Sequence, residues 1–505
     1  MRNFKKTMSV LLAATMAFSA FSALPFTASA AEVESSNLVN AEFGDYEYQV
    51  LDDGTAEIIT YNGSAETLTI PSKLDGYTVT SIGDSAFKEC TSLTSVSIPS
   101  GVTSIKSWAF GDCRNLTNVN IPDSVTSIGD WAFGACNLLS LTFGKELKVI
   151  GQYAFPFNKN LKSVTFNNNL EIIDRYAFDT CISLKEIIIP DSVKEIGLCA
   201  FSGCTELENV TIPDSVTSIG GSAFYKTGIY NSQPDSVVYV DGWACGYNGK
   251  MPENTSIAFR EGTKGIADSA FSSSMLKSVN IPDSVSNIGN GSFRACSSLT
   301  SVTIGNGITS ISKESFSGCS SITDIKFGNS VTTIGASAFY NCSSLESITF
   351  PDGLTSIGDS AFSRCTGLKN IVFPNNLTEI GGNAFTSCSS LERVTIPANV
   401  TKIAFTAFNV RSDSLTIYGY EDSAAENYAE IKGIPFINLS DVPSPLLGDV
   451  NGDGVLSVAD ATLIQKHSAS IIDFTDEQLA NADMNGDGVV NVSDATAIQR
   501  ELVNS

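Results

Sequence analysis

The chain contains the stretch Leu93-Thr-Ser-Val96-Ser-Ile98-Pro-Ser-Gly-Val102-Thr-Ser-Ile105-Lys-Ser-Trp-Ala109-Phe110-Gly-Asp-Cys113, and it repeats this unit with small changes over most of its 505 residues. Each copy is marked by a Phe that follows a small residue; these are Phe87, Phe110, Phe133, Phe155, Phe178, Phe201, Phe224, Phe271, Phe293, Phe316, Phe339, Phe362, Phe385 and Phe408. Their spacing is 23 residues, apart from two of 22 and one of 47. A period of about 20 to 29 residues is typical of a solenoid, in which each coil buries its apolar face by stacking on its neighbours. The spacing therefore predicts a β-rich solenoid with coils of about 23 residues.

Each unit carries the pattern of a short strand that ends in a turn. Val96 and Ile98 point to one face because successive strand residues alternate, and the serines between them point to the other. Pro99 has no N–H to donate to a β-ladder, so it ends the strand and starts a turn with the polar residue that follows.

The string Ile121-Pro-Asp-Ser-Val-Thr-Ser-Ile-Gly129, followed by Ala132-Phe133-x-x-Cys136, resembles the BspA-like class of leucine-rich repeats. The resemblance extends from about Leu68 to Phe408, so we expect a leucine-rich-repeat solenoid over residues 68–410. This class occurs in bacterial surface and secreted proteins, some of them adhesive, which implies a binding role.

Segments outside the regular repeat predict how the solenoid begins and where it is interrupted. Residues 46–61, with Asp52-Asp-Gly-Thr55 at their centre, have the pattern of a hairpin that caps the first coil, within a cap at 31–67. A similar string at 238–249 lies inside the 47-residue gap. We therefore expect a remodelled coil at 225–265, with a kink or protrusion there.

The far end of the solenoid has its own closing signals. Residues 423–432 have the pattern of a short helix, and Gly433 after them is a typical C-cap residue, so we expect a C-terminal cap at 411–439. Residues 440–446 form a linker that Pro443 and Pro445 make semi-rigid.

The tail holds two copies of one acidic motif. Asp449-Val-Asn-Gly-Asp-Gly-Val-Leu-Ser-Val-Ala-Asp460 returns 34 residues later as Asp483-Met-Asn-Gly-Asp-Gly-Val-Val-Asn-Val-Ser-Asp494. Oxygen-bearing side chains stand at loop positions 1, 3, 5, 9 and 12, and Gly at position 6 permits the positive φ that folds the loop around one centre. Ca²⁺ takes about six to eight oxygen ligands in such loops. We predict two calcium ions, one held by Asp449, Asn451, Asp453, the Val455 carbonyl, Ser457 and Asp460, and one by Asp483, Asn485, Asp487, the Val489 carbonyl, Asn491 and Asp494.

The duplicated loop–helix unit, beginning Gly448-Asp-Val-Asn-Gly-Asp-Gly454, closely resembles the type I dockerin. Unlike the calmodulin hand, each loop ends in Asp rather than Glu and is followed by a single helix. The resemblance implies a small all-α calcium-binding dockerin module at 447–505, built from two EF-hand-like loop–helix units.

A dockerin implies a cohesin module of a scaffoldin or cell-surface anchor as its partner, and a place in a cellulosome-like complex. The cohesin-contacting residues implied by the resemblance are Val458, Ala459, Leu463 and Lys466 in the first copy, and Val492, Ser493, Ala497 and Arg500 in the second. The similarity of the two helices would allow a two-fold related, dual binding mode. Ile464 and Ile498 are expected to face the core, because so small a module needs every apolar residue it has.

The N-terminus has the pattern of a secretory signal peptide at residues 1–30. Arg2, Lys5 and Lys6 precede an apolar run, and Ala28-Ser-Ala30 is a small-residue cleavage site. The apolar run is too short to favour a membrane span. We therefore expect a secreted, extracellular protein, associated with a cellulosome or a cell surface. The formal net charge of −24 argues against nucleic acid and anionic membranes as partners.

Twelve cysteines in a secreted chain raise the question of disulfides. Ten stand three residues after the repeated Phe, where leucine-rich repeats commonly place an inward Asn or Cys; they are Cys90, Cys113, Cys136, Cys181, Cys204, Cys296, Cys319, Cys342, Cys365 and Cys388. Adjacent coils about 4.7–4.9 Å apart would leave these residues within disulfide range, so pairing stays open. We favour free buried thiols that act as small core residues. Cys199 and Cys245 lie outside this column, and the absence of a Cys-x-x-Cys pair argues against zinc.

Four successive coils carry an aromatic residue two positions before the Phe: Trp108, Trp131, Tyr153 and Tyr176. Such a strip is a candidate platform for sugar rings or a protein partner, because aromatic rings offer large, rigid contact areas. The alternative is that the rings pack on one another and on the turn beneath, with a purely structural role.

Nothing in the repeats has the pattern of a catalytic centre. The only histidine, His467, is expected to be a lone exposed side chain, so no Ser/His or Cys/His pair can form in the solenoid. Repeated acids such as Asp123 and Asp191 belong to the Pro-Asp-Ser turns. We predict a non-catalytic modular protein, docked by its dockerin, whose solenoid binds a protein, a glycan or a surface. Two alternatives are a polysaccharide-degrading enzyme of the glycoside hydrolase type and a passive spacer.

Overall fold

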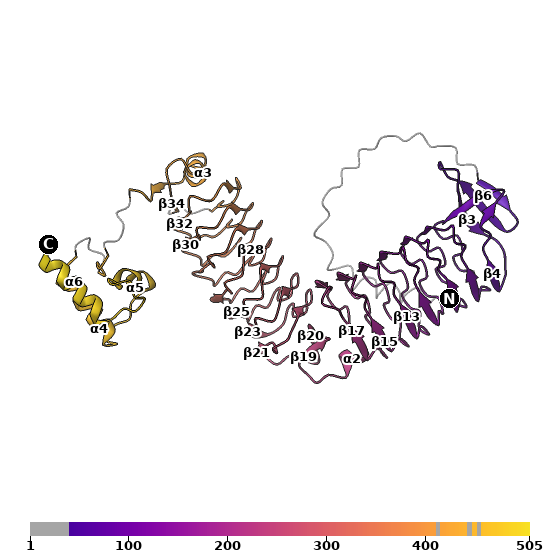
Figure 1. Ribbon diagram of the computed structural model, residues 1–505, viewed down its shortest axis with the longest axis horizontal. Coiled ribbons are helices and arrows are strands. Elements are labelled where there is room, and N and C mark those ends of the chain that lie inside the picture. Colours follow the sequence, from indigo (N-terminus) through magenta and orange to yellow (C-terminus); the bar gives the residue numbers. More distant parts are fainter. Residues whose placement is uncertain (1–39, 411–414, 442–446, 452–455, 505) are drawn as a thin grey trace.

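The computed structural model describes residues 40–410, 415–441, 447–451 and 456–504. The signal peptide, most of the linker, and the calcium ligands Asp453 and Val455 lie outside these residues. Described residues form a β-solenoid of about 23-residue coils, followed by a helical tail, as the repeat and the loops predict (Figure 1).

Most coils contribute two short strands to two parallel ladders; the coil that contains β29 (Ser356–Ile357) has only the shorter strand. In one coil these are β7 (Ser95–Ser97) and β8 (Ser104–Ile105), and the same residues pair from coil to coil, as in Ile105 with Ile128. The predicted strand around Val96 is present. The second strand was not predicted, because two residues are too few to show an alternating pattern.

The remaining strands of the first half fall into the same two series. The longer series is β4 (Thr67–Thr69), β9 (Asn118–Asn120), β11 (Ser140–Thr142), β13 (Ser163–Thr165), β15 (Glu186–Ile188) and β17 (Asn209–Thr211). The shorter series is β10 (Ser127–Ile128), β12 (Val149–Ile150), β14 (Ile172–Ile173), β16 (Glu195–Ile196) and β18 (Ser218–Ile219).

Both series resume in the second half. The longer strands are β21 (Thr255–Ala258), β23 (Leu276–Ile281), β25 (Ser301–Ile304), β27 (Asp324–Lys326), β30 (Asn370–Val372), β32 (Arg393–Thr395) and β34 (Thr416–Gly419). The shorter strands are β22 (Gly265–Ile266), β24 (Asn287–Ile288), β26 (Ser310–Ile311), β28 (Thr333–Ile334), β29 (Ser356–Ile357), β31 (Glu379–Ile380) and β33 (Lys402–Ile403).

The repeated Phe forms the spine of the core. Within each half, neighbouring rings stack nearly parallel; the Phe110 and Phe133 centroids, for example, are 5.1 Å apart with an interplanar angle of 7°. The spine is interrupted between Phe224 and Phe271, and the buried apolar residues accordingly form two separate clusters. The solenoid is therefore two stacks of coils in one chain.

Left-handed backbone on both sides of the Phe makes the turns of each coil. Trp108 and Asp112 flank Phe110 with φ of 58° and 59°, and equivalent residues recur along the chain. The N–H groups of Trp108, Phe110 and Asp112 donate to carbonyls of the next coil at 2.9, 2.7 and 2.8 Å. The turn thus aims alternate N–H groups at the neighbouring coil, and it does so mostly without glycine, which sequence patterns did not reveal.

Substitutions at one of these left-handed positions should show how strongly the backbone there disfavours some side chains. Ser337 has φ of 55°, and its N–H donates to the Asp359 carbonyl at 2.8 Å. A β-branched side chain in left-handed backbone is strongly disfavoured, so we expect Ser337→Val to lower the free energy of unfolding by about 2 kcal/mol. Ser337→Gly should be at least as stable as the wild type. Urea denaturation of the two variants checks this, and equal midpoints would contradict it.

A meander caps the first stack. Strands β1 (Asn40–Phe43), β2 (Tyr46–Val50) and β3 (Ala56–Tyr61) pair antiparallel, and β3 then pairs parallel with β6 (Tyr77–Ile82), which also pairs with β5 (Lys73–Leu74). The predicted hairpin is therefore present, with β1 as an added strand. The Tyr61 ring stacks on Phe87 at 5.1 Å and closes the end of the spine.

A second hairpin, β19 (Val237–Val240) and β20 (Trp243–Tyr247), separates the two stacks. Val240 and Trp243 belong to the first core, whereas Ala244 belongs to the second. Because successive strand residues point to opposite faces, one hairpin covers the open ends of both stacks. The interruption in the repeat is thus a shared cap.

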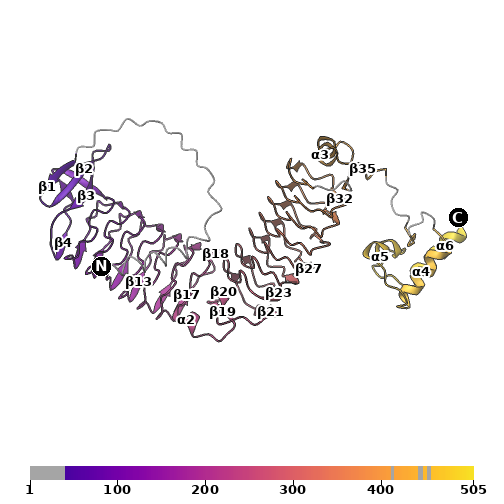
Figure 2. The same cartoon turned by 180° about the vertical axis from the view of Figure 1, so that it is seen from behind.

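The hairpin also bends the molecule at this point. On one side of the joint the coils stay in contact, since the Asp268 N–H donates to the Ile219 carbonyl at 2.9 Å. Elsewhere the hairpin and the short helix α2 (Gly228–Asn231) are inserted between the stacks. Figures 1 and 2 show the two stacks meeting at an angle, with α2, β19 and β20 on the outer side of the bend. Because the hairpin and α2 separate the two stacks on one side only, they produce the kink expected at 225–265.

The far end is closed by α3 (Ala424–Lys432) and β35 (Phe436–Asn438). Ser423 caps the helix N-terminus, and Gly433 ends it with φ of 64°, as predicted. The Tyr428 hydroxyl accepts a hydrogen bond from the Phe408 N–H at 3.0 Å, so the helix covers the last ring of the spine.

The tail contains α4 (Val458–Ser468), α5 (Asp476–Ala482) and α6 (Val492–Asn504). Helix α5 was not predicted, although the capping box of Thr475 and Gln478 marks its start. Ile464 and Ile498 are fully buried in the small core of the tail, as expected. Across the described parts of the chain, every helix is too short or too polar to cross a membrane.

Candidate functional site

The second acidic loop is folded around the carboxylate at its first position. Asp483 Oδ1 accepts the N–H groups of Gly486 and Asp487 at 2.9 and 3.2 Å, and its Oδ2 accepts that of Gly488 at 2.9 Å. Gly488, at loop position 6, has φ of 80°. The backbone therefore curls around one centre in the way the motif predicts.

The last carboxylate of each loop is fully buried. Asp494 accepts the N–H groups of Asn485 and Asn491 at 3.2 and 2.9 Å, one on each oxygen. Asp460 accepts those of Val450 and Ser457, both at 3.0 Å. These bonds tie the start of each loop to its end and hold the position-12 side chain inside it.

The donor set fits a hard divalent cation. A carboxylate has about four acceptor sites, so the two N–H bonds to Asp494 leave capacity for a metal ion. No three His, Cys, Asp or Glu side chains converge in the residues that the structure describes. The second loop is fully described, so its three predicted acidic ligands, Asp483, Asp487 and Asp494, are not gathered around one point here. The remaining predicted ligands are Asn side chains and a carbonyl oxygen, which are also ligand types that Ca²⁺ takes.

In the first loop the described ligands are Asp449, Asn451, Ser457 and Asp460. The Asp449 side chain is buried, and the Ser457 hydroxyl donates to Asp460 at 2.8 Å while capping α4. Asp453 and Val455 lie outside the described residues.

The predicted cohesin-contacting residues lie on α4 and α6, which pack against each other. Val458 is 63% exposed and Val492 is 55% exposed, at equivalent positions of the two helices. Ala459, Lys466, Ser493 and Arg500 are also exposed, whereas Ala497 is half-buried. Leu463 packs partly against the core, so much of its side chain faces inward.

His467 differs from the expectation of a lone exposed residue. Its ring stacks on Phe474, with centroids 4.3 Å apart, and its Nδ1 lies 3.1 Å from the Ile472 carbonyl oxygen. The side chain is half-buried and fastens the loop that follows α4. Sequence reasoning missed this because the stacking partner lies beyond the end of the helix.

The aromatic strip is a continuous stack of rings. Trp108 and Trp131 are 4.9 Å apart, Trp131 and Tyr153 5.1 Å, and Tyr153 and Tyr176 4.5 Å, all nearly parallel. The outer side of the strip is also occupied, since Lys88 Nζ lies 4.3 Å from the Trp108 ring centre. The ring faces therefore pack against one another, and mainly the ring edges are left for a ligand. This favours the structural alternative over a platform for sugar rings.

All twelve cysteines are free thiols. At the position three residues after the repeated Phe, the thiol donates a hydrogen bond to the carbonyl of the Phe one coil earlier. Cys113 Sγ, for example, donates to Phe87 O at 3.0 Å. Asn158 occupies this column in one coil, and its amide donates to the Phe133 carbonyl at 2.9 Å. The thiols are buried core residues, as expected, and the column also satisfies carbonyls of the turn, which was not predicted.

We expect thiol labelling to follow burial. Only Cys90 and Cys199 are half-buried, so they alone should react rapidly in the native protein, and all twelve should react after denaturation without reductant. Fewer than twelve reactive thiols after denaturation would reveal disulfides.

Burial raises the pKa of Cys90 to about 11 and of Cys245 to about 12. The folded chain therefore keeps protons that the unfolded chain loses, and stability should fall as pH rises above about 8.5.

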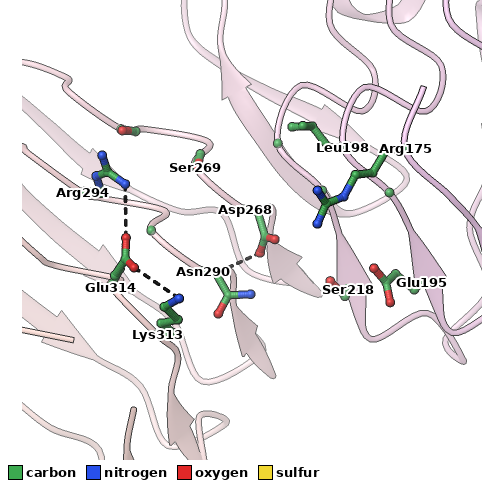
Figure 3. A pocket seen from close by; sticks show the side chains of 15 residues that line it. Arg175, Glu195, Leu198, Ser218, Asp268, Ser269, Asn290, Arg294, Lys313 and Glu314 are labelled. Atoms are coloured by element: carbon green, nitrogen blue, oxygen red, sulfur yellow. Dashed lines mark hydrogen bonds and ion pairs between the residues drawn. The ribbon is translucent and has the colours of Figure 1, made fainter. Parts of the chain in front are cut away.

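A polar cleft of about 620 Å³ lies at the joint between the stacks. Figure 3 shows Arg175, Glu195 and Leu198 on the side of the first stack, and Asp268 with the Arg294–Glu314–Lys313 group on the side of the second. Asp268 accepts the Asn290 N–H at 2.7 Å, and burial raises the pKa of the Asp268 carboxyl. Sequence reasoning missed this cleft, because its two walls come from separate parts of the chain, residues 175–221 and 268–314.

Comparison with protein families gives two matches. The family model of the BspA type leucine-rich repeat region matches residues 80–197, 171–300, 247–345 and 291–416, and that of the type I dockerin domain matches residues 447–503. A search of curated proteins finds no match.

Solved structures similar to this chain are bacterial leucine-rich repeat proteins. One from Bacteroides ovatus is 28% identical, over 76% of this chain and 100% of that chain, with a TM-score of 0.35. A cell-surface protein from Faecalibacterium prausnitzii is 25% identical, over 78% and 98%, with a TM-score of 0.32. The pneumococcal vaccine antigen PcpA is 18% identical, over 79% and 98%, with a TM-score of 0.35.

The matched families indicate the class of function. A dockerin domain implies docking to a cohesin in a cellulosome-like complex, type I dockerins bind calcium, and the repeat region suggests binding. Both families are non-catalytic, and together they suggest an extracellular or cell-surface protein. The chain belongs to the BspA-type leucine-rich repeat family and carries a type I dockerin domain at its C-terminal end.

Proposed function

We propose that this protein is a secreted, non-catalytic component of a cellulosome-like complex, in which the dockerin binds a cohesin and the solenoid binds a protein, a glycan or a surface. The cohesin-binding part of this proposal rests on the exposed first residues of α4 and α6. Val458 and Val492 are large apolar side chains left in solvent at equivalent positions, next to the two acidic loops. Exposed apolar residues repeated in this way are typical of a protein-binding surface.

Two calcium ions hold this surface in place. The proposed ligands are six residues from each twelve-residue loop, and the buried Asp460 and Asp494 connect each loop to the helix that carries the contact residues. When bound, each ion supplies positive charge that balances these buried carboxylates. The chain supplies the ligands and the hydrogen bonds that join the two ends of each loop.

Export by the signal peptide at 1–30 fits this function, and the negative charge of the chain argues against nucleic acid as a partner. A passive spacer would share the docking half but bind nothing through its repeats.

The docking face is tested with a cohesin panel and paired variants. We expect Val458→Asp together with Val492→Asp to weaken capture at least about 100-fold, because each places a charge in an apolar contact. Val503→Asp is the matched control: Val503 is 85% exposed on α6 but outside the proposed contact set, so its capture should be unchanged. If either single variant binds almost normally, the two copies act as alternative faces. Full capture by the double variant would refute the proposed face.

The enzyme alternative can be tested at the cleft between the stacks. Glu195 and Asp268 both line the cleft at the joint, and a pair of carboxylates with one raised pKa is what glycoside hydrolysis requires. A reducing-sugar assay on plant polysaccharides should show no turnover by the mature chain. Turnover that is lost in Asp268→Asn would establish the enzyme instead.

A further inference from the structure

The interruption of the repeat builds a pocket that regular coils do not have. It has a volume of about 420 Å³ and lies where the turn after Phe224 faces the turn after Phe271 across the shared hairpin. Its principal side chains are Tyr225, Tyr230, Tyr247, Lys250, Met251 and Met275. Three of the protein's tyrosines thus meet in one hollow, brought together from α2, β20 and their flanking turns.

The segments that flank this pocket are joined by partly buried hydrogen bonds. The Gln233 amide donates to the carbonyls of Ile229 and Tyr239, both at 2.9 Å, and accepts the Tyr239 N–H. The Asn248 amide donates to the Gln233 carbonyl at 2.6 Å. The segment after α2 and the segment after β20 are therefore tied together, and a ligand would meet a pocket that is already formed.

The rings in this pocket are arranged differently from those of the aromatic strip. Tyr230 is buried, and its hydroxyl donates to the Tyr247 carbonyl at 2.9 Å. Tyr225 meets Tyr230 edge to face, at 5.5 Å and 81°, and remains 43% exposed. Lys226 Nζ lies over the Tyr225 ring, 5.3 Å from its centre, so a ligand would contact the exposed part of the ring beside this ammonium group.

Polar groups surround the rings. Four serines, Ser222, Ser269, Ser273 and Ser274, line the pocket and supply hydroxyl donors and acceptors. Lys250 is the one charged residue in the lining, and it is exposed. Lys226, over the Tyr225 ring, is a second cation at the pocket, and the carboxylate of Asp235 lies against Gly249 of the lining. Two cations against one acid form a locally positive region on a chain of net charge −24, and such a region would attract an anionic ligand.

We propose that this pocket binds a sugar residue of an acidic glycan. The sugar ring packs on Tyr225, its hydroxyls bond to the serines, and its carboxylate pairs with Lys250. A flat apolar surface surrounded by hydroxyls and cations matches a uronic-acid ring better than an apolar peptide side chain, which would leave the serines and the lysine without partners. This inference rests on the proposed function, since it identifies the ligand class of the solenoid.

The test is isothermal titration of the full mature chain with defined oligosaccharides. Oligogalacturonate is the acidic probe, and a cello-oligosaccharide of equal length is the neutral probe. We expect the acidic probe to bind, Tyr225→Ala and Lys250→Gln each to weaken that binding about tenfold, and Tyr225→Phe to keep it. The matched control is Tyr420→Ala, because Tyr420 is 41% exposed and lies outside the pocket. Its binding should be unchanged.

Each other outcome overturns the assignment. These are no binding of the acidic probe, binding that survives Tyr225→Ala, equal binding of the neutral probe with no effect of Lys250→Gln, or capture of protein ligands only. Cohesin capture is measured on the same samples and reports separately on the docking half of the proposed function. A protein ligand for the repeats would leave the proposed function intact while removing the glycan site.

Discussion

We expect chelation of calcium to abolish cohesin capture and to unfold the dockerin, and added calcium to restore both. This is the largest effect we expect for this protein. The buried apolar residues of the dockerin are Val450, Ala461, Ile464, Ala482, Ala495 and Ile498. So small a core contributes little stability, whereas ion binding contributes folding free energy directly. Without the ion, the buried carboxylates of Asp460 and Asp494 would repel the loop oxygens around them.

The measurement combines capture with far-UV circular dichroism of the full chain, because the three helices of the dockerin supply most of the helical signal. Calcium titration should give two sites. Asp460→Ala and Asp494→Ala should each remove one of them, while Glu501→Ala, an exposed acid on α6, should keep both. Capture that persists in excess chelator would show that calcium does not hold the docking surface.

Removal of one ring from the Phe spine is the second large effect. Phe339 is fully buried between Phe316 and Phe362, with centroids 5.4 and 5.2 Å away, and Phe327 meets it edge on at 5.9 Å. A Phe→Ala change in such a site leaves a cavity that adjoining coils cannot fill, because their strands stay in register. We expect Phe339→Ala to lower the free energy of unfolding by about 3–5 kcal/mol.

Urea denaturation measures the loss, and Phe405→Ala is the control. Phe405 is 67% exposed, and its principal neighbour is Lys432 Nζ, 3.4 Å from the ring centre, so its loss should change stability by less than about 1 kcal/mol. Equal effects of the two changes would contradict the spine as the main source of stability.

The two-stack architecture predicts that the destabilisation caused by Phe339→Ala is confined to the second stack. Phe339 belongs to the second core, and the shared hairpin lies between it and the first. In a solenoid each coil contacts only its neighbours, so destabilisation spreads along one stack before it crosses a cap. Hydrogen exchange in Phe339→Ala should therefore accelerate between β21 and β34 and remain near wild type around Phe133.

Much of this architecture follows from local chemistry that a sequence displays. The 23-residue spacing of Phe predicts the solenoid, Pro99 ends a strand, Ser423 and Gly433 bound a helix, and the Asp-x-Asn-x-Asp-Gly loops predict the dockerin. Each of these signals depends on residues close together in the chain. The hairpins at both ends of the first stack were likewise predictable from their turn residues.

Other features arose only when distant coils were brought together. The second strand of each coil and the left-handed turns exist because N–H groups must reach the next coil, 23 residues away. The four rings of the strip were visible in the sequence, but only their stacking shows that their faces are covered.

Period, turn residues and the spacing of acidic residues are local properties, so the amino-acid pattern alone predicts a repeat solenoid followed by a dockerin with two acidic loops. Tertiary structure alone decided the bend, the shared cap, the cleft and the tyrosine pocket. These depend on where the hairpin at 237–247 is inserted between two stacks whose facing coils are 47 residues apart, and no local pattern encodes that contact.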